Sequence, residues 1–323
     1  MDKTKKITRV VVNGDSLSLY NPEDISTQII EGTIETLDDK DGKVGMVGFY
    51  AFYNQRNLRN INLPACTSLA SGAFGNCYSL TNVNLPNAET IAYQAFVGCS
   101  WLSQIVLPKC LVVGSSAFSG CANFTQANLP NCELVGESAF NSCRKLSQVN
   151  APNCATISNS AFANCDALTQ ISFPNCTSIG ANAFMNCYRL YDVYLPNVTY
   201  LGAGALTNTG LSEIEMSKIS GIYTNAFSSC TKLQKAKFDS VNSIASSTFT
   251  RCTMLSQLIL LSTSVASLSA TNAFASTPMS LSSYLGYFGS IYVPASLVDS
   301  YKASTNWTAY SARITSIENL PTE

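Results

Sequence analysis

The chain has 323 residues with a formal net charge of −1, and charged residues make up only 12% of it. Nucleic acids and anionic membranes bind basic surfaces, and the sequence has no basic stripe, so we expect neither as a partner. No apolar run reaches the roughly 18 residues that span a bilayer, so we expect no membrane insertion.

Residues 1–45 are predicted to form an N-terminal β-hairpin cap. Ile7–Val12 and Leu17–Leu19 flank Asn13-Gly14, and Asn-Gly between two apolar runs is the strongest short-range signal of a hairpin. The hairpin would cover the open strand edge of the array that follows. The segment starts with basic residues but lacks the apolar core of a secretory signal, so we expect no export signal in it.

A repeat with a step of 22 residues occupies residues 46–277. Ala-Phe recurs from Ala51-Phe52 to Ala183-Phe184, and beyond Ala205-Leu206 the frame drifts. Prolines keep the same step, and each ends a run such as Leu80–Leu85, which alternates with the period of a half-buried strand. One unit cannot bury its apolar face alone, whereas stacked units can. The sequence therefore predicts a β-rich, right-handed solenoid superhelix of about ten coils with a parallel β-sheet.

The unit L-x-x-I-x-L-P-(x4)-I-G-x-x-A-F-x-x-C resembles the BspA-like leucine-rich repeat, and the resemblance covers residues 46–277. Residues 291–307 also resemble the closing segment found after such arrays. The resemblance implies a bacterial cell-surface or secreted adhesion module that recognises an extracellular protein or glycan, and it implies no enzymatic activity.

The thirteen cysteines fall into two columns, three residues after the phenylalanine and two residues after the proline. Ala88, Val198, Thr209 and Thr277 stand in the same columns, which indicates small buried groups. Spacings of 11 and 22 do not fit zinc sites, and an odd count argues against a disulfide framework. We therefore expect reduced, buried thiols without a metal or cofactor. The sequence leaves open the possibility of an occasional disulfide between stacked neighbours.

The outward strand positions form a ladder of uncharged polar side chains that either hydrates the sheet or serves as a recognition face. One coil differs because tyrosines cluster in it, and tyrosine dominates binding hot spots and stacks on sugars. The predicted ligand-binding residues are Tyr188, Tyr191, Asp192, Tyr194, Tyr200, Gln170, Gln148 and Asn150.

Residues 278–323 are predicted to form a C-terminal cap with a short helix. Ser296-Leu297-Val298-Asp299 resembles a capping box that opens a helix through about Ser304. Leu297, Tyr301, Trp307, Tyr310 and Ile314 would then fold over the last coil. With both ends of the array covered, we expect a monomer.

Two other functions remain open. In the first, the array is a structural spacer or a phage virion-associated component, and the ends make the attachments. In the second, one cysteine is the nucleophile of a hydrolase, which is disfavoured because the chain has no histidine to activate it. The sequence also leaves open a virion-associated or cytoplasmic location in place of the cell surface.

Overall fold

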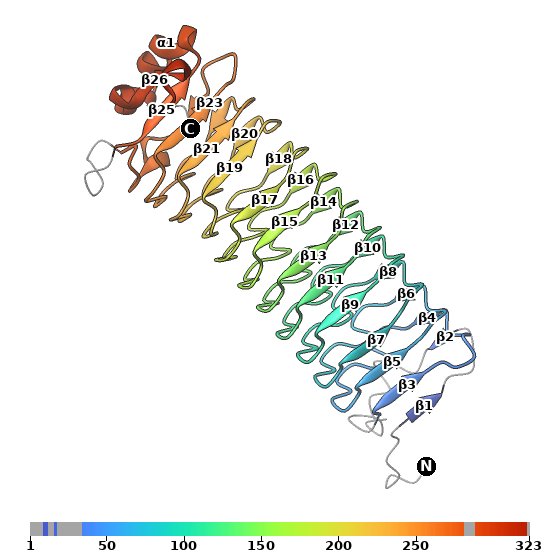
Figure 1. Cartoon of the computed structure of the whole chain (residues 1–323). Coiled ribbons are helices and arrows are strands. Elements are labelled where there is room, and N and C mark those ends of the chain that lie inside the picture. Colours follow the sequence, from blue (N-terminus) through green and yellow to red (C-terminus); the bar gives the residue numbers. More distant parts are fainter. Residues whose placement is uncertain (1–8, 12–15, 18–33, 281–287, 322–323) are drawn as a thin grey trace. The chain divides into compact units, whose positions relative to one another are not determined.

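The computed structural model describes residues 9–11, 16–17, 34–280 and 288–321. The chain divides into two compact units, residues 1–168 and 169–323. Both units repeat the same coil, in which a main strand, a short strand and a tight turn follow one another (Figure 1). The predicted solenoid with parallel sheets is confirmed, since every strand pair given below is parallel.

In the first unit the main strands carry the outward amides. In most of those whose side chains are described the central residue is buried, as Ile61 is between the polar pair Asn60 and Asn62, whereas Val83 and Val149 are half-buried. Pairing advances by one coil at a time, so that Gln126 lies beside Gln148. The strands are β1 (Arg9–Val11), β3 (Thr36–Asp38), β5 (Asn60–Asn62), β7 (Asn82–Asn84), β9 (Gln104–Val106), β11 (Gln126–Asn128) and β13 (Gln148–Asn150).

A second parallel ladder of short strands lies on another side of the coil. Its inward residue belongs to the second apolar pair of the repeat, as Val135 does in β12. The strands of this ladder in the first unit are β2 (Ser16–Leu17), β4 (Met46–Val47), β6 (Ser68–Leu69), β8 (Thr90–Ile91), β10 (Val112–Val113), β12 (Leu134–Val135) and β14 (Thr156–Ile157).

The Ala-Phe turn closes each coil and supplies its largest core residue. Successive phenylalanine rings stack nearly parallel, with 5.3 Å between the ring centroids of Phe96 and Phe118. Two backbone positions per turn have positive φ, such as Ser138 at 54° and Ser142 at 61°. Glycine and asparagine tolerate this left-handed region best, and together with serine they occupy most of these positions. The chain's small polar residues therefore serve the turns as well as the surface.

The second unit contains the same two kinds of strand. Four of its main strands are four residues long, so that Met216 and Phe238 join the core. The main strands are β15 (Gln170–Ser172), β17 (Asp192–Tyr194), β19 (Glu213–Met216), β21 (Lys235–Phe238), β23 (Gln257–Leu260), β25 (Ser290–Val293) and β26 (Ile314–Ser316). The short strands are β16 (Ser178–Ile179), β18 (Tyr200–Leu201), β20 (Gly221–Ile222), β22 (Ser243–Ile244) and β24 (Ser267–Leu268).

Helical turns close the second unit beyond β24. Trp307 and Tyr310 are buried against Phe274, with ring centroids 6.1 and 5.1 Å from its ring. Tyr301 and Ile314 are also buried, as predicted, whereas Leu297 is half-buried. The helices are the 3-10 helices η2 (Thr271–Phe274), η3 (Ala295–Leu297), η4 (Trp307–Arg313) and η5 (Ile317–Asn319) and the α-helix α1 (Val298–Ala303).

Two local predictions at the ends of the chain are wrong. β1 and β2 do not form a hairpin, because β1 pairs in parallel with β3 and β2 in parallel with β4. Asn13-Gly14 itself lies outside the described residues. The capping box is also wrong, because no side chain caps α1, whose N-cap residue is Leu297. Strand pairing moreover continues past residue 277 through β25 and β26.

Candidate functional site: a groove in the strand ladder

The candidate site begins with a coil that is one residue short. In the regular coils the next core residue stands three positions after the cysteine column, as Leu190 does after Cys187, but Leu211 stands only two positions after Thr209. Gly210 fills the shortened turn, where a Cβ atom would lie 2.6 Å from the carbonyl oxygen of Tyr188. Only glycine therefore fits this close approach of two backbones without a shift.

Strand pairing is interrupted immediately after this turn. β17 pairs with β15, and β19 with β21, but β17 and β19 are not hydrogen-bonded neighbours among the described strands. β7 and β9 in the first unit are not paired either, although their coils keep the step of 22 residues. The short strands β18 and β20 are not paired either. The turns of the same two coils stay bonded, as from the N–H of Leu206 to the carbonyl of Ala226 at 2.9 Å. The two coils are therefore joined on the turn side and open on the strand side.

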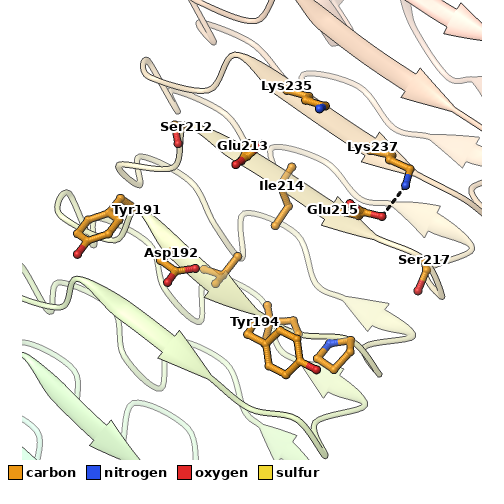
Figure 2. Close-up of a pocket in the computed structure, with 13 residues that line it drawn as sticks. Tyr191, Asp192, Tyr194, Ser212, Glu213, Ile214, Glu215, Ser217, Lys235 and Lys237 are labelled. Atoms are coloured by element: carbon orange, nitrogen blue, oxygen red, sulfur yellow. Dashed lines mark hydrogen bonds and ion pairs between the residues drawn. The ribbon is translucent and has the colours of Figure 1, made fainter. Parts of the chain in front are cut away.

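A groove of about 660 Å³ occupies the open strand side. Tyr191, Asp192 and Tyr194 line it from β17 and the residue before it, and Figure 2 shows them facing the side chains of β19. Next to the lining residues Pro196 and Ser217, the Lys218 ammonium group donates to Asn197 Oδ1 at 2.6 Å and joins the two coils. The groove residues from the second strand and beyond are Ser212, Glu213, Ile214, Glu215, Ser217, Lys235 and Lys237.

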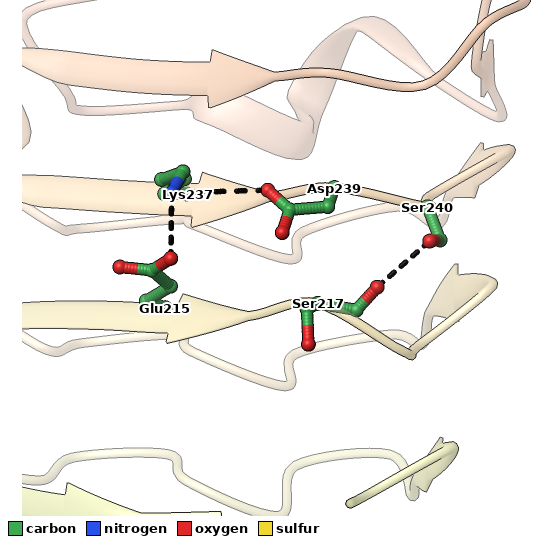
Figure 3. A network of polar contacts seen from close by, with 5 residues as sticks. All are labelled: Glu215, Ser217, Lys237, Asp239 and Ser240. Atoms are coloured by element: carbon green, nitrogen blue, oxygen red, sulfur yellow. Dashed lines mark hydrogen bonds and ion pairs between the residues drawn. The ribbon is translucent and has the colours of Figure 1, made fainter. Parts of the chain in front are cut away.

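An ion pair fixes one side of the groove. Lys237 Nζ lies 2.6 Å from Glu215 Oε1 and 4.0 Å from Asp239 Oδ1 (Figure 3). The hydrogen bond to Glu215 raises the pKa of Lys237 above its ordinary value. Beside this pair the Ser240 hydroxyl donates to the carbonyl of Ser217 at 2.7 Å (Figure 3). These contacts hold β19 and β21 in register and leave Asp192 and Glu213 exposed across the opening.

The predicted tyrosine cluster is divided by the structure. Tyr191 and Tyr194 line the groove and are 57% and 58% exposed. Tyr188 is exposed in the turn before β17 and is not a groove residue. Tyr200 lies in the other ladder, where its ring centroid is 5.3 Å from that of Tyr223. These tyrosines are close together in the sequence, but the coil places them on different sides of the solenoid.

The predicted amides are exposed strand residues outside the groove. Gln170 lies beside Asp192 in the pairing of β15 with β17. Gln148 and Asn150 belong to β13 of the first unit, where Asn150 donates to Asn128 Oδ1 at 2.8 Å. Similar bonds join Asn82 to Asn60 and Asn84 to Asn62. The ladder that was expected to hydrate the sheet therefore also bonds along it.

Sequence reasoning missed the groove and the charged residues on its second strand. The signal was present as a step of 21 residues instead of 22 between Ala205 and Ala226. Thr209-Gly210-Leu211 locates that deletion in the turn. Pairing of Glu215 with Lys237 could also have been read from their spacing of 22 residues.

The cysteines are core residues, as predicted. All thirteen are buried reduced thiols. Burial raises the pKa of Cys121 to about 12 and that of Cys132 to about 11, which leaves such thiols protonated and unreactive at neutral pH. In the described part of the chain no three ligand-type side chains gather as a metal site would require. The described helices are also too short or too polar to cross a bilayer.

Sequence comparison identifies the repeat. A model of the BspA type leucine rich repeat region matches residues 45–168 and 155–280, in six copies. A search of curated proteins finds no match to the chain.

Solved bacterial structures share the coil. A leucine-rich repeat protein from Bacteroides ovatus is 23% identical with a TM-score of 0.51, and the match covers 85% of this chain and 88% of that one. A leucine rich cell surface protein from Faecalibacterium prausnitzii is 19% identical with a TM-score of 0.38, over 94% of this chain and 86% of that one. The first likeness supports the fold alone.

Proposed function

Because this chain belongs to the BspA-type leucine-rich repeat family, we propose that it is a non-enzymatic recognition protein of the cell surface or of the secreted fraction. It binds an extracellular protein or glycan through the groove between β17 and β19. The observation that carries this proposal is the groove itself, in which two exposed tyrosines and several charged side chains gather where strand pairing stops.

The groove has the properties of a binding site. Its volume of about 660 Å³ lies within the usual range for ligand pockets. Tyr191 and Tyr194 offer large, rigid rings whose hydroxyl groups can bond to a partner. Other coils also expose aromatic side chains, such as Trp101 and Tyr93, but these lie outside the groove, so binding energy should concentrate on the two groove rings.

Hydrolysis is a weaker interpretation of the same groove. A glycosidase pairs one carboxylate with a carboxylic acid that apolar surroundings keep protonated. Asp192 and Glu213 are exposed to solvent, and Glu215 is bonded to Lys237. A cysteine nucleophile would have to leave the core, because every thiol is buried. We therefore propose recognition without catalysis.

The test is binding of the whole chain to an array of extracellular-matrix proteins and glycans. The double variant Tyr191→Ala/Tyr194→Ala should lose binding to the partner that the wild type selects by at least about tenfold, since aromatic anchors cost 2 kcal/mol or more on truncation. Both side chains are exposed, so the thermal unfolding of the variant should match that of the wild type.

Tyr93→Ala provides the matched control, because Tyr93 is 47% exposed in the first unit and lies outside the groove. Equal binding by wild type and the groove double variant would contradict the proposal. Loss of binding only when residues 1–45 or 278–323 are deleted would favour the spacer function instead.

A further inference from the structure

The charges that line the groove largely compensate one another. The charged lining residues are Asp192, Glu213, Glu215, Lys235 and Lys237. Glu213 lies opposite Lys235, and Glu215 lies opposite Lys237, in the register of β19 with β21. Opposite charges placed across a strand pair offset each other. Asp192 lies beside an uncharged residue of β15, so it is the one charged residue of the lining without a counter-charge opposite it in these registers.

The accessible apolar surface of the groove is aromatic. Tyr191 and Tyr194 are exposed, whereas the lining residues Leu195 and Ile214 are buried. These buried residues form no apolar recess for an inserted side chain, although such a recess is what usually anchors a protein hot spot. The groove offers two ring faces instead, and Figure 2 shows Asp192 between them along β17.

The polar groups beside the rings are available to a ligand. Among the residues that the structure describes, none forms a hydrogen bond or ion pair with the Asp192 carboxylate or with the hydroxyl groups of Tyr191 and Tyr194. An ionised carboxylate only accepts hydrogen bonds, whereas a phenol both donates and accepts them. The lining therefore combines two flat apolar faces, one strong acceptor and neutral hydroxyl groups.

We propose that the ligand of this groove is an uncharged oligosaccharide. The inference rests on the proposed function, and it names the class of ligand. A sugar ring has an apolar C–H face, which packs on a tyrosine ring while the phenol stays free to bond. The hydroxyl groups around the sugar ring donate to Asp192, and hydrogen bonds to an ionised acceptor are about twice as strong as neutral ones.

The length and charge of the ligand follow from the same residues. Tyr194 stands three positions after Tyr191 along β17 and the residue before it, so their Cα atoms are about 10 Å apart in extended chain. A ligand that reaches both rings is therefore longer than one sugar ring. Sulfate or carboxylate groups on the ligand would be repelled by Asp192, so acidic oligosaccharides should bind more weakly.

The experiment measures binding of the full-length chain to an oligosaccharide array. The array carries uncharged oligosaccharides of glucose, galactose, mannose, xylose and N-acetylglucosamine, the corresponding monosaccharides, and sulfated or sialylated forms of the same oligosaccharides. At least one uncharged oligosaccharide should bind, and its monosaccharide and its acidic form should bind at least about tenfold more weakly. Binding of acidic forms alone, or of no oligosaccharide, would overturn the proposal.

Variants separate the rings from the carboxylate. Tyr191→Phe/Tyr194→Phe keeps both ring faces, so it should hold the selected oligosaccharide within about threefold of the wild type, whereas Tyr191→Ala/Tyr194→Ala should lose at least about tenfold. Asp192→Asn should cost about tenfold, because an amide is a weaker acceptor than a carboxylate. Glu133→Gln, at an exposed carboxylate of the first unit, should bind as the wild type does. Wild-type affinity in Asp192→Asn would contradict the role of this carboxylate and overturn the proposal.

The two proposals fail in different ways. If an unglycosylated matrix protein binds through Tyr191 and Tyr194 but no oligosaccharide does, the recognition function stands and the oligosaccharide is wrong. If neither a protein nor an oligosaccharide depends on the groove, both are wrong. The substituted side chains are all exposed, so thermal unfolding of each variant should match that of the wild type and a loss of binding reports on the groove.

Discussion

At the residue scale, the buried thiols serve the backbone as well as the core. Cys99 and Cys121 each donate to the carbonyl of the phenylalanine one coil earlier, both at 3.2 Å. The same two carbonyls also accept the backbone N–H groups of Cys77 and Cys99, so each thiol is a second donor to its carbonyl. Where threonine replaces cysteine, its hydroxyl also bonds to a carbonyl, as from Thr277 to Phe274 at 2.7 Å. Burial of these columns was predictable from the sequence, but this bonding role was not.

Stability should fall steeply in alkali, because burial raises the pKa of Cys121 from 9.0 to about 12. Below pH 9 the thiol is protonated in both states, so its full contribution to stability is present. Above pH 9 the unfolded chain loses the proton while the folded chain keeps it until about pH 12. The free energy of unfolding should therefore drop by about 1.4 kcal/mol per pH unit for each such thiol. Urea denaturation at pH 8, 9 and 10 measures this slope.

Cys121→Ala is the control for the alkaline slope. It removes one titrating thiol, so the decline above pH 9 should become shallower by about 1.4 kcal/mol per pH unit, even though the variant is less stable at pH 8. A free energy of unfolding that stays constant between pH 8 and pH 10 would contradict a core of protonated thiols.

At the element scale, the gap between β17 and β19 follows a turn that is one residue short, whereas β7 and β9 are unpaired after a turn of regular length. Insertion of one asparagine between Gly210 and Leu211 should slow hydrogen exchange at the amides of Leu195 and Glu213 only if the short turn, and not the strand sequences, keeps β17 and β19 apart. The amide of Leu129 is already bonded in the wild type and serves as the internal reference. Unchanged exchange at Leu195 and Glu213 in a folded variant would mean that the short turn is not what opens the ladder.

The helical turns after β25 depend on one buried indole. Trp307 is fully buried and donates from Nε1 to the carbonyl of Ala266 at 2.6 Å. Trp307→Ala should lower the free energy of unfolding of the second unit by about 3–5 kcal/mol. Trp101 lies in the first unit and is 63% exposed, so Trp101→Ala should change the free energy of unfolding of that unit by less than about 0.5 kcal/mol. Guanidinium denaturation of both variants makes the comparison, and equal losses would contradict this packing.

Local signals at the ends were weaker guides than the repeat. Asn13-Gly14 favoured a hairpin, but pairing with the neighbouring coils aligns β1 and β2 in parallel. The helix near residue 298 was predicted from a capping-box pattern, and α1 lies there, but no side chain caps it. A short sequence pattern cannot specify the backbone that a cap requires.

At the scale of the whole molecule, the sequence predicts the coil far better than the site. Strands such as Asn82–Asn84 lie where the alternation of polar and apolar residues predicts them, because the same side-chain pattern is repeated in every coil. The groove lies where two main strands separate, which also happens between β7 and β9 at a regular step of the repeat. The tyrosines of the groove were recognised as unusual, but strand separation depends on backbone geometry that a residue pattern does not contain. The boundaries at residues 45 and 277 stay predictions.

Hydrogen-exchange footprinting of the full chain with its selected partner tests the recognition groove most directly. Partner binding should protect the amides of residues 191–195 and 212–215 more than any others, because the ligand covers the two strand edges. Protection confined to the first unit or to the segment 288–321, with exchange at the groove unchanged, would contradict the assignment of binding to this groove.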